Sequence, residues 1–226
     1  METQKIVILA VVLLAIIALV WFGFTQLESY NEYIIDDSDF VDGQDLIENI
    51  PSSELTEAEI AGLIQMREEE KLARDVYSFL GQKWNLQILS NIAESEQTHT
   101  NSVKVLLDRY GIEDPVKDDT VGVFTSQVMT DLYTNLVKQG EASALGALIV
   151  GATIEDLDIY DLTELLLETD NSDIITVYNN LQKGSRNHLR AFIGQIDNNG
   201  GSYSPQYISE EEFNLIISSA QEKGQV

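Results

Sequence analysis

The sequence predicts an all-α protein, and two observations support this prediction. Apolar residues recur at steps of three and four along four long stretches, which is the spacing of one face of an α-helix. Residues suited to helix ends flank these stretches: Thr56 and Glu59 form a capping-box pair, and Gly111 suits a left-handed cap. We therefore expect a four-helix bundle with extra short helices. The long helices are expected at residues 56–80, 86–110, 142–168 and 172–196.

Residues 6–24 form an uninterrupted apolar run without charge, after a short polar start at residues 1–5. At a rise of about 1.5 Å per residue, a helix of this length can cross a hydrocarbon core. A cleaved secretory signal is the alternative, but it would have a shorter apolar region and a small-residue cleavage site. Because Lys5 precedes the run, we expect a single-pass anchor in the cell membrane, with the N-terminus cytoplasmic and the rest of the chain outside.

Residues 25–55 are acidic and contain neither Lys nor Arg, which is typical of a solvated segment. We expect them to form a stalk between the anchor and the helical part, residues 56–222. Two shorter helices are expected in that helical part. One covers residues 126–138, and the other begins after Ser209 and packs on the outside of the bundle.

Each long helix has a polar residue in its apolar stripe. In chain order these residues are Glu70, Glu96 with His99, Glu155, and His188. Asp158 lies one turn after Glu155, at the edge of the third stripe. Glu68 and Glu69 turn away from the first stripe, so we expect them to be solvated. A carboxylate or imidazole inside an apolar seam needs a partner, because an unpaired buried charge is costly.

These polar positions lie near the middle of their helices, and such positions meet at one level when neighbouring helices run antiparallel. Converging carboxylates repel one another unless a cation neutralises them. Carboxylate and imidazole ligands suit iron, manganese or zinc. We therefore predict a site for one or two metal ions. Its candidate ligands are Glu70, Glu96, His99, Glu155, His188 and Asp158.

A salt-bridged core without metal is the alternative interpretation. Arg67 and Arg74 flank Glu70 by three and four residues. Arg186 and Arg190 flank His188 of the fourth helix by two residues on either side. Arginine partners would neutralise buried acids without any cation. We favour the metal, because all four helices place such residues at a matching depth.

The composition narrows the possible functions. The formal net charge of −25 makes nucleic acid an unsuitable partner, because its phosphates would be repelled. The chain has no cysteine, which excludes disulfides, iron–sulfur clusters and cysteine nucleophiles. With only two histidines, one chain cannot build a three-histidine site. A homo-oligomer is compatible with the sequence.

The stripe residues lie in segments that resemble rubrerythrins and ferritins. Residues 70–77 are similar to their first-helix segment, in which a ligand Glu precedes a Tyr. Residues 92–99 resemble their second-helix Glu-x-x-His motif, and residues 188–192 resemble the end of their fourth-helix motif. This resemblance implies a ferritin-like four-helix bundle with iron or manganese as cofactor. If the protein is an enzyme, it implies a di-metal oxidoreductase that handles oxygen or peroxide.

Residues 55–220 also resemble the family catalogued as domain of unknown function 2202, with signature segments at 68–77 and 184–192. One position departs from a full di-iron pattern, because Ser185 stands where the fourth helix would supply a Glu. Asp158 is a candidate replacement, and without it the site would hold one metal or two asymmetrically. The departure favours the alternative function, a non-catalytic surface structural or interaction protein built on a degenerate ferritin-like bundle.

Overall fold

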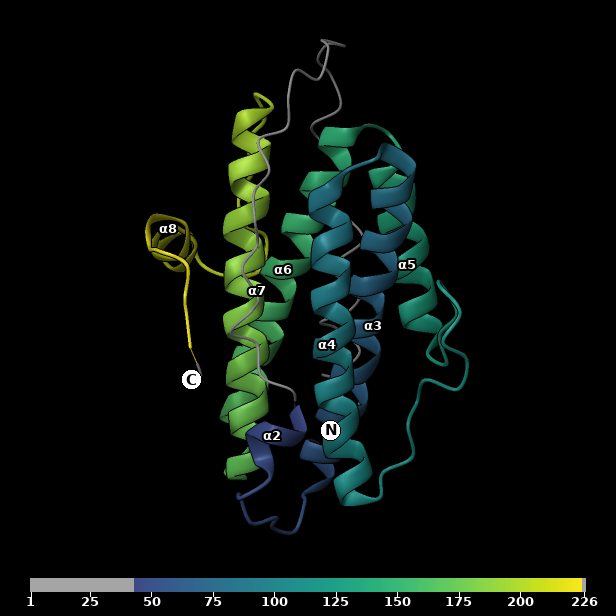
Figure 1. Ribbon diagram of the computed structural model, residues 1–226, viewed down its shortest axis with the longest axis vertical. Helices are drawn as coiled ribbons and strands as arrows, with labels where there is room; N and C mark the ends of the chain where they lie inside the picture. The colour runs from purple at the N-terminus through teal and green to yellow at the C-terminus, as the bar shows by residue number, and fades with distance from the viewer. Residues whose placement is uncertain (1–42, 225–226) are drawn as a thin grey trace, which may run out of the picture. The chain divides into compact units, whose positions relative to one another are not determined.

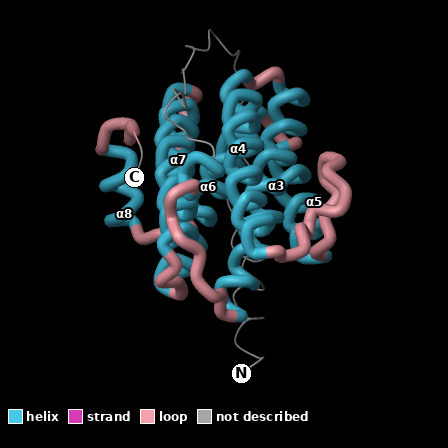
Figure 2. The backbone as a smooth tube through the Cα atoms, turned by 60° about the horizontal axis from the view of Figure 1, so that its bottom comes forward, coloured by secondary structure: helices cyan, strands magenta, loops and turns pink. Residues whose placement is uncertain are grey.

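The computed structural model describes residues 43–224, and all regular structure in this part of the chain is helical (Figures 1 and 2). The helices are α2 (Gly43–Ile47), α3 (Glu57–Trp84), α4 (Gln87–Tyr110), α5 (Gln127–Gly140), α6 (Ala144–Leu167), α7 (Ser172–Asn198) and α8 (Glu210–Ser218). The all-α prediction is therefore confirmed for these residues. The expected long helices correspond to α3, α4, α6 and α7, with ends shifted by a few residues.

The predicted membrane anchor, residues 6–24, lies outside the described residues, as does the first part of the expected stalk. Within the part of the chain that the structure covers, no helix combines the length and apolar character needed to cross a bilayer.

Local sequence sets the ends of α3 and α4. The Thr56 side chain accepts a hydrogen bond from the Glu59 backbone N–H (3.2 Å), and the Glu59 carboxylate accepts one from the Thr56 N–H (2.7 Å). These two bonds are the predicted capping box. α3 continues to Trp84 and ends at Asn85, which adopts the left-handed conformation with φ 53°. Gly111, with φ 65°, ends α4 in the same conformation.

The four long helices lie side by side as two pairs. α3 packs against α4, and α6 packs against α7, while α3–α6 and α4–α7 contacts join the pairs. α3 and α6 run antiparallel, because Tyr77 lies beside Gly151 whereas Gly62 lies beside Leu165. α5 packs on α3 and α6, and α8 packs on α7 (Figure 1).

The apolar core is divided into two clusters, and every long helix contributes to both. The first cluster includes Val76, Leu89, Leu148 and Phe192. The second includes Leu63, Leu106, Leu162 and Leu181. Along α3, α4 and α7, the polar residues singled out in the sequence fall between the helix's contributions to the two clusters. Along α6, Glu155 and Asp158 lie just before Ile159, the last buried residue that this helix contributes to the first cluster. A polar layer therefore separates two apolar regions.

The described end of the expected stalk, residues 43–55, packs partly on the helices. Ile47 of α2 is only 1 % exposed and belongs to the second apolar cluster. Its carbonyl accepts a hydrogen bond from Arg109 Nη1 (2.9 Å). Gly43 approaches α4 so closely that an added Cβ would lie 2.6 Å from Ser102 Cα. This segment is therefore not wholly solvated, because its few apolar residues find a surface on α4 and α7.

Candidate metal centre

The Glu96 carboxylate of α4 lies between the two histidines. Its Oε2 is 2.7 Å from Nδ1 of His99, one turn along the same helix, and its Oε1 is 2.8 Å from Nδ1 of His188 on α7. The two imidazole rings lie 5.4 Å apart between centroids. One potential ligand atom from each of the three residues falls within 4.8 Å of the others, a spacing that suits a shared metal ion.

Two further carboxylates flank this trio. Glu70 Oε2 of α3 is 3.3 Å from His99 Nδ1, and Glu155 Oε1 of α6 is 3.5 Å from His188 Nδ1. Both glutamates are 0 % exposed. Each imidazole Nδ1 thus faces the shared Glu96 and one outer glutamate of its own, so the arrangement is nearly symmetric.

Asp158 belongs to the same group of acids. Its side chain is 3 % exposed, and burial together with the carboxylates of Glu70 and Glu155 raises its pKa well above the usual range. Ser185, which stands where a carboxylate was expected, is also buried. Its hydroxyl donates to the Leu181 carbonyl of its own helix (3.2 Å). The fourth carboxylate near this site is therefore contributed by α6 and not by α7.

Several buried oxygens of the cluster accept no hydrogen bond from the described residues. They are Glu70 Oε1, Glu155 Oε2 and Asp158 Oδ2. A buried acceptor without a donor costs about 1–3 kcal/mol, which a native protein rarely leaves uncompensated. Hard oxygen atoms of this kind, together with imidazole nitrogens, fit the ligand preference of iron or manganese.

The charges in the cluster depend strongly on one another. Burial raises the pKa of Glu70 to about 8 and that of Glu155 to about 7. Burial opposes the charged form of His99, but Glu96 and Glu70 outweigh it and raise the pKa of His99 to about 10. Burial likewise opposes ionisation of Glu96, yet the two histidines lower its pKa. In the absence of metal, protons therefore supply the positive charge that the acids need.

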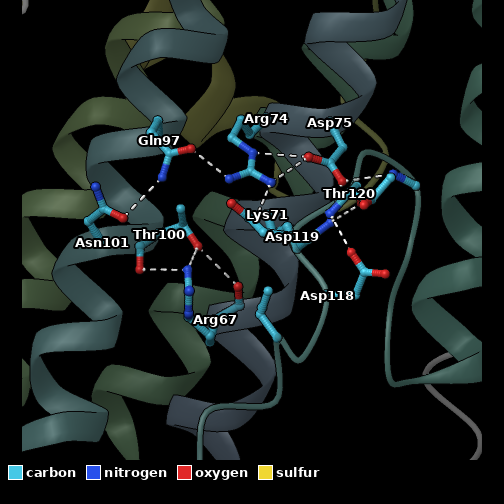
Figure 3. A network of polar contacts seen from close by, with 12 residues as sticks. Arg67, Lys71, Arg74, Asp75, Gln97, Thr100, Asn101, Asp118, Asp119 and Thr120 are labelled. Carbon is cyan, nitrogen blue, oxygen red and sulfur yellow. Dashed lines mark hydrogen bonds and ion pairs between the residues drawn. The ribbon is translucent and has the colours of Figure 1, made fainter.

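The arginines of the salt-bridge alternative have other partners. Arg67 pairs with Asp114 (3.1 Å), and Arg74 pairs with Asp75 (2.8 Å) and Asp119 (2.7 Å), as Figure 3 shows in part. Arg186 and Arg190 both pair with a single acid near the C-terminus, Glu222. Among the described residues, no ion pair joins any of these arginines to the metal-site candidates. The arginine pairing that the alternative interpretation requires is therefore not formed among the described residues.

The expectation that Glu68 and Glu69 are solvated is wrong. They are 5 % and 6 % exposed. Glu68 accepts hydrogen bonds from the backbone N–H groups of Thr125 and Ser126 (2.8 and 3.1 Å), so it fixes the start of α5. Glu69 accepts one from Gln65 (3.0 Å) and lies near an acid of α6. Helical spacing along α3 could not predict this burial, because the loop before α5 covers Glu68 and helix α6 lies beside Glu69.

Two residues outside the predicted ligand set shape the site. The Tyr77 hydroxyl donates to Glu155 Oε1 (2.7 Å), and the side chain is 0 % exposed. Gly184 of α7 leaves space for a ligand, because an added Cβ would lie 2.5 Å from Cε1 of His99. The sequence signal for Tyr77 is its position seven residues after Glu70, which places it on the same face of α3. No local signal distinguishes Gly184.

Comparison with known proteins places all these residues in a matched region. The sequence profile of the uncharacterized protein domain DUF2202 matches residues 59–220. An uncharacterized protein, MJ0754, of Methanocaldococcus jannaschii is 57 % identical over 178 residues, which are 79 % of this chain and 96 % of that protein. The crystal structure of the hypothetical protein MJ0754 superimposes with a TM-score of 0.76 and covers 77 % of this chain and 99 % of that one.

Proposed function

We propose that this chain, which belongs to the DUF2202 family, binds one or two iron or manganese ions in the core of a ferritin-like four-helix bundle. The observation that supports the proposal best is the Glu96 carboxylate, whose two oxygens each face the Nδ1 of a different histidine. Glu96, His99 and His188 would hold the metal together, with carboxylate oxygen and imidazole nitrogen as ligand atoms. Helical bundles build their metal sites from such side chains on facing helices.

The remaining acids would complete two similar halves. His99 with Glu70 forms one half, and His188 with Glu155 forms the other. Asp158 would serve both halves, because its charge interacts with the carboxylates of Glu70 and Glu155. With Ser185 bonded to its own helix, α7 supplies only an imidazole to this set. We expect the reduced carboxylate count to leave coordination positions open to water, oxygen or peroxide.

An iron or manganese centre here would supply redox chemistry toward oxygen or peroxide. The chain itself holds and orients the ligands. The Tyr77 hydroxyl fixes Glu155 by donating to its Oε1, and it would leave the other oxygen of that carboxylate for the metal. The two apolar clusters above and below the polar layer exclude bulk water, which strengthens every electrostatic interaction in the site.

We also propose that residues 6–24 anchor the protein in the cell membrane, with the helical part outside. The support is the uncharged apolar run and its single preceding lysine. Carbonate extraction of isolated membranes tests whether the chain is anchored. Protease treatment of intact cells tests whether the helical part lies outside. Recovery of the chain in the soluble fraction would contradict the anchor.

A second function is favoured by one observation, the serine at position 185. A bundle that has lost a bridging carboxylate could serve only as a structural or interaction module. The two functions differ in whether the cluster binds metal at all, so one experiment separates them.

That experiment is elemental analysis of the purified full-length chain after reconstitution with iron or manganese. We expect one or two equivalents in the parent, and none in a Glu96→Gln, His99→Ala double variant. Glu94→Gln is the matched control, because Glu94 is exposed on the same helix two residues away. A parent that stays empty would rule out the metal function and leave the structural one.

A further inference from the structure

Acids recur at every third position along α6, starting at the candidate centre. They are Glu155, Asp158, Asp161 and Glu164, named here the acidic row. A step of three residues falls short of a full helical turn by about 60°, so the row winds around the helix. It leads from the core to the surface: the first two acids are buried, Asp161 is half-buried and Glu164 is exposed.

Glu69 of the neighbouring helix α3 joins this row where it leaves the centre. Because α3 and α6 run antiparallel, Glu69 comes level with the middle of the row. Its carboxylate lies close enough to Asp161 of α6 and to Glu70 of its own helix for their charges to interact. Glu69 thus has acidic neighbours on two sides, one toward the centre and one toward the surface.

Two oxygens in this region are buried without a donor. Glu69 is 6 % exposed, and its Oε2 accepts no hydrogen bond from the described residues. The same holds for Oδ2 of Asp158, which is 3 % exposed. Gln65 satisfies only the other oxygen of Glu69. Buried acceptors of this kind are costly unless a partner reaches them, and the acids around these two cannot donate while ionised.

Basic side chains do not compensate for these charges. Among the described residues, the ion pairs of Lys and Arg engage other acids, such as Asp75, Asp114 and Glu222, and none engages Glu69, Asp158, Asp161 or Glu164. A solvated acidic face would need no compensation, but Glu69 and Asp158 are not solvated. The structure therefore contains a line of uncompensated carboxylates that connects solvent with the candidate centre.

We propose that the acidic row and Glu69 form the uptake route by which divalent cations reach the centre. This inference rests on the proposed function. Carboxylate oxygens bind divalent cations of this class as hard ligands, and a succession of them allows a cation to pass from one to the next. A row of acids of one charge sign also concentrates cations where it meets solvent, and it accelerates their capture.

The test is the rate of Co²⁺ uptake by the metal-free, full-length protein, followed in a stopped-flow spectrometer by the visible absorbance of histidine-bound cobalt. The variants are Asp161→Asn and Glu69→Gln, which keep the shape of each side chain. Asp131→Asn is the matched control, because Asp131 is an exposed acid on α5 whose side chain accepts a hydrogen bond from Gln127. Final cobalt content is measured on each sample.

We expect both variants to load about tenfold more slowly than the parent and the control, with a weaker dependence on salt. Their final cobalt content should equal that of the parent. Parent-like rates in both variants would overturn the uptake route and leave the centre intact. A lower final content would identify the mutated acid as a ligand and contradict its role in uptake. A parent that binds no cobalt would overturn both the route and the proposed function.

Discussion

Helix α3 presents two buried polar networks on neighbouring faces, and they are built on opposite principles. On one face, Lys71 is 0 % exposed and pairs with Asp75 (2.5 Å), as Figure 3 shows. Its Nζ also lies 4.5 Å from the centre of the Phe124 ring. Arg74 completes this network through Asp75, Asp119 and Gln97. On the other face, Glu70 lies 3.3 Å from Nδ1 of His99, and its charge interacts with those of further acids. Lys71 and Glu70 are therefore equally buried, but Lys71 belongs to a network of ion pairs and Glu70 to a cluster of acids.

The comparison teaches how to tell a structural network from a ligand site. The basic network contains its own counter-charges, so it is complete without anything from outside. The acidic cluster has more carboxylates than cations, and several of its oxygens lack donors among the described residues. Changes to the first network should alter stability alone, whereas changes to the second should alter metal content and pH response.

The largest expected effect is the pH dependence of the metal-free protein. A carboxyl whose pKa is higher in the folded than in the unfolded state contributes stability that is lost as pH rises between the two values. Glu70 and Glu155, raised to about 8 and about 7, both act in this direction. His99, raised to about 10, loses its contribution over a higher range.

We therefore expect the metal-free protein to lose on the order of 5 kcal/mol of stability from about pH 5 to about pH 8. The metal-loaded protein should change much less, because the cation replaces the protons. Urea unfolding at both pH values, with and without Mn²⁺, measures the difference. Equal pH profiles for the two forms would show that protons and metal do not compete for this cluster.

The next largest effect should come from Asp75→Asn in the basic network. This change leaves Lys71 buried without its counter-charge, and breaking a buried pair in this way costs about 3–5 kcal/mol. The urea midpoint should fall while the metal content of the folded protein stays unchanged. A loss of metal at parent-like stability would contradict the separation of the two networks.

The converse variant is Glu70→Gln in the acidic cluster. Losing groups that merely support metal ligands already reduces affinity about 10–100-fold, so losing a ligand should cost at least about 100-fold. Stability without metal should stay the same or rise at neutral pH, because the raised pKa of Glu70 requires it to take up a proton on folding, which glutamine does not. Competition with a chelator gives the affinity, and thermal unfolding gives the stability.

A smaller effect is expected for Gly184→Ala. The added Cβ would overlap the His99 ring, so the ring must move, at a cost of about 1–3 kcal/mol for overpacking. Because His99 serves one half of the proposed site, we expect metal content to fall by one equivalent in a dinuclear centre. Ala147→Gly is the control, because it also changes a buried core residue by one carbon atom but lies away from the site. It shows how a general change in packing affects metal content.

The smallest effect is expected for Tyr77→Phe, which removes one hydrogen bond to Glu155. The free energy of unfolding should fall by about 1–2 kcal/mol, which is typical of losing one buried hydrogen bond to an ionisable group. The titration of the cluster is the more informative measurement. Without this donor, the Glu155 carboxylate is less stabilised, so its pKa should rise, and metal binding should require a higher pH.

The sequence predicted the four long helices well because their signals are local. The apolar spacing, the Thr56 capping box and Gly111 each act within one or two turns. The convergence of Glu96, His99 and His188 was also predictable, since mid-helix positions of antiparallel neighbours meet.

What the sequence did not reveal depends on partners that are distant along the chain. Arg67 and Arg74 find their acids 47 and 45 residues away, in the loop before α5. The burial of Glu69 depends on α6, and the docking of Ile47 depends on α4 and α7. Spacing within one helix carries no information about such contacts.

The polar layer between the two apolar clusters has a consequence for cooperativity. Unfolding is all-or-none when every part of a core packs against the next part. Here the two apolar clusters are joined through a polar layer with few apolar contacts. Without a cation, the two ends can open in separate steps, which amide hydrogen exchange would detect as two protected units. A bound cation would cross-link all four helices at that level, and the protein would then open as a single unit.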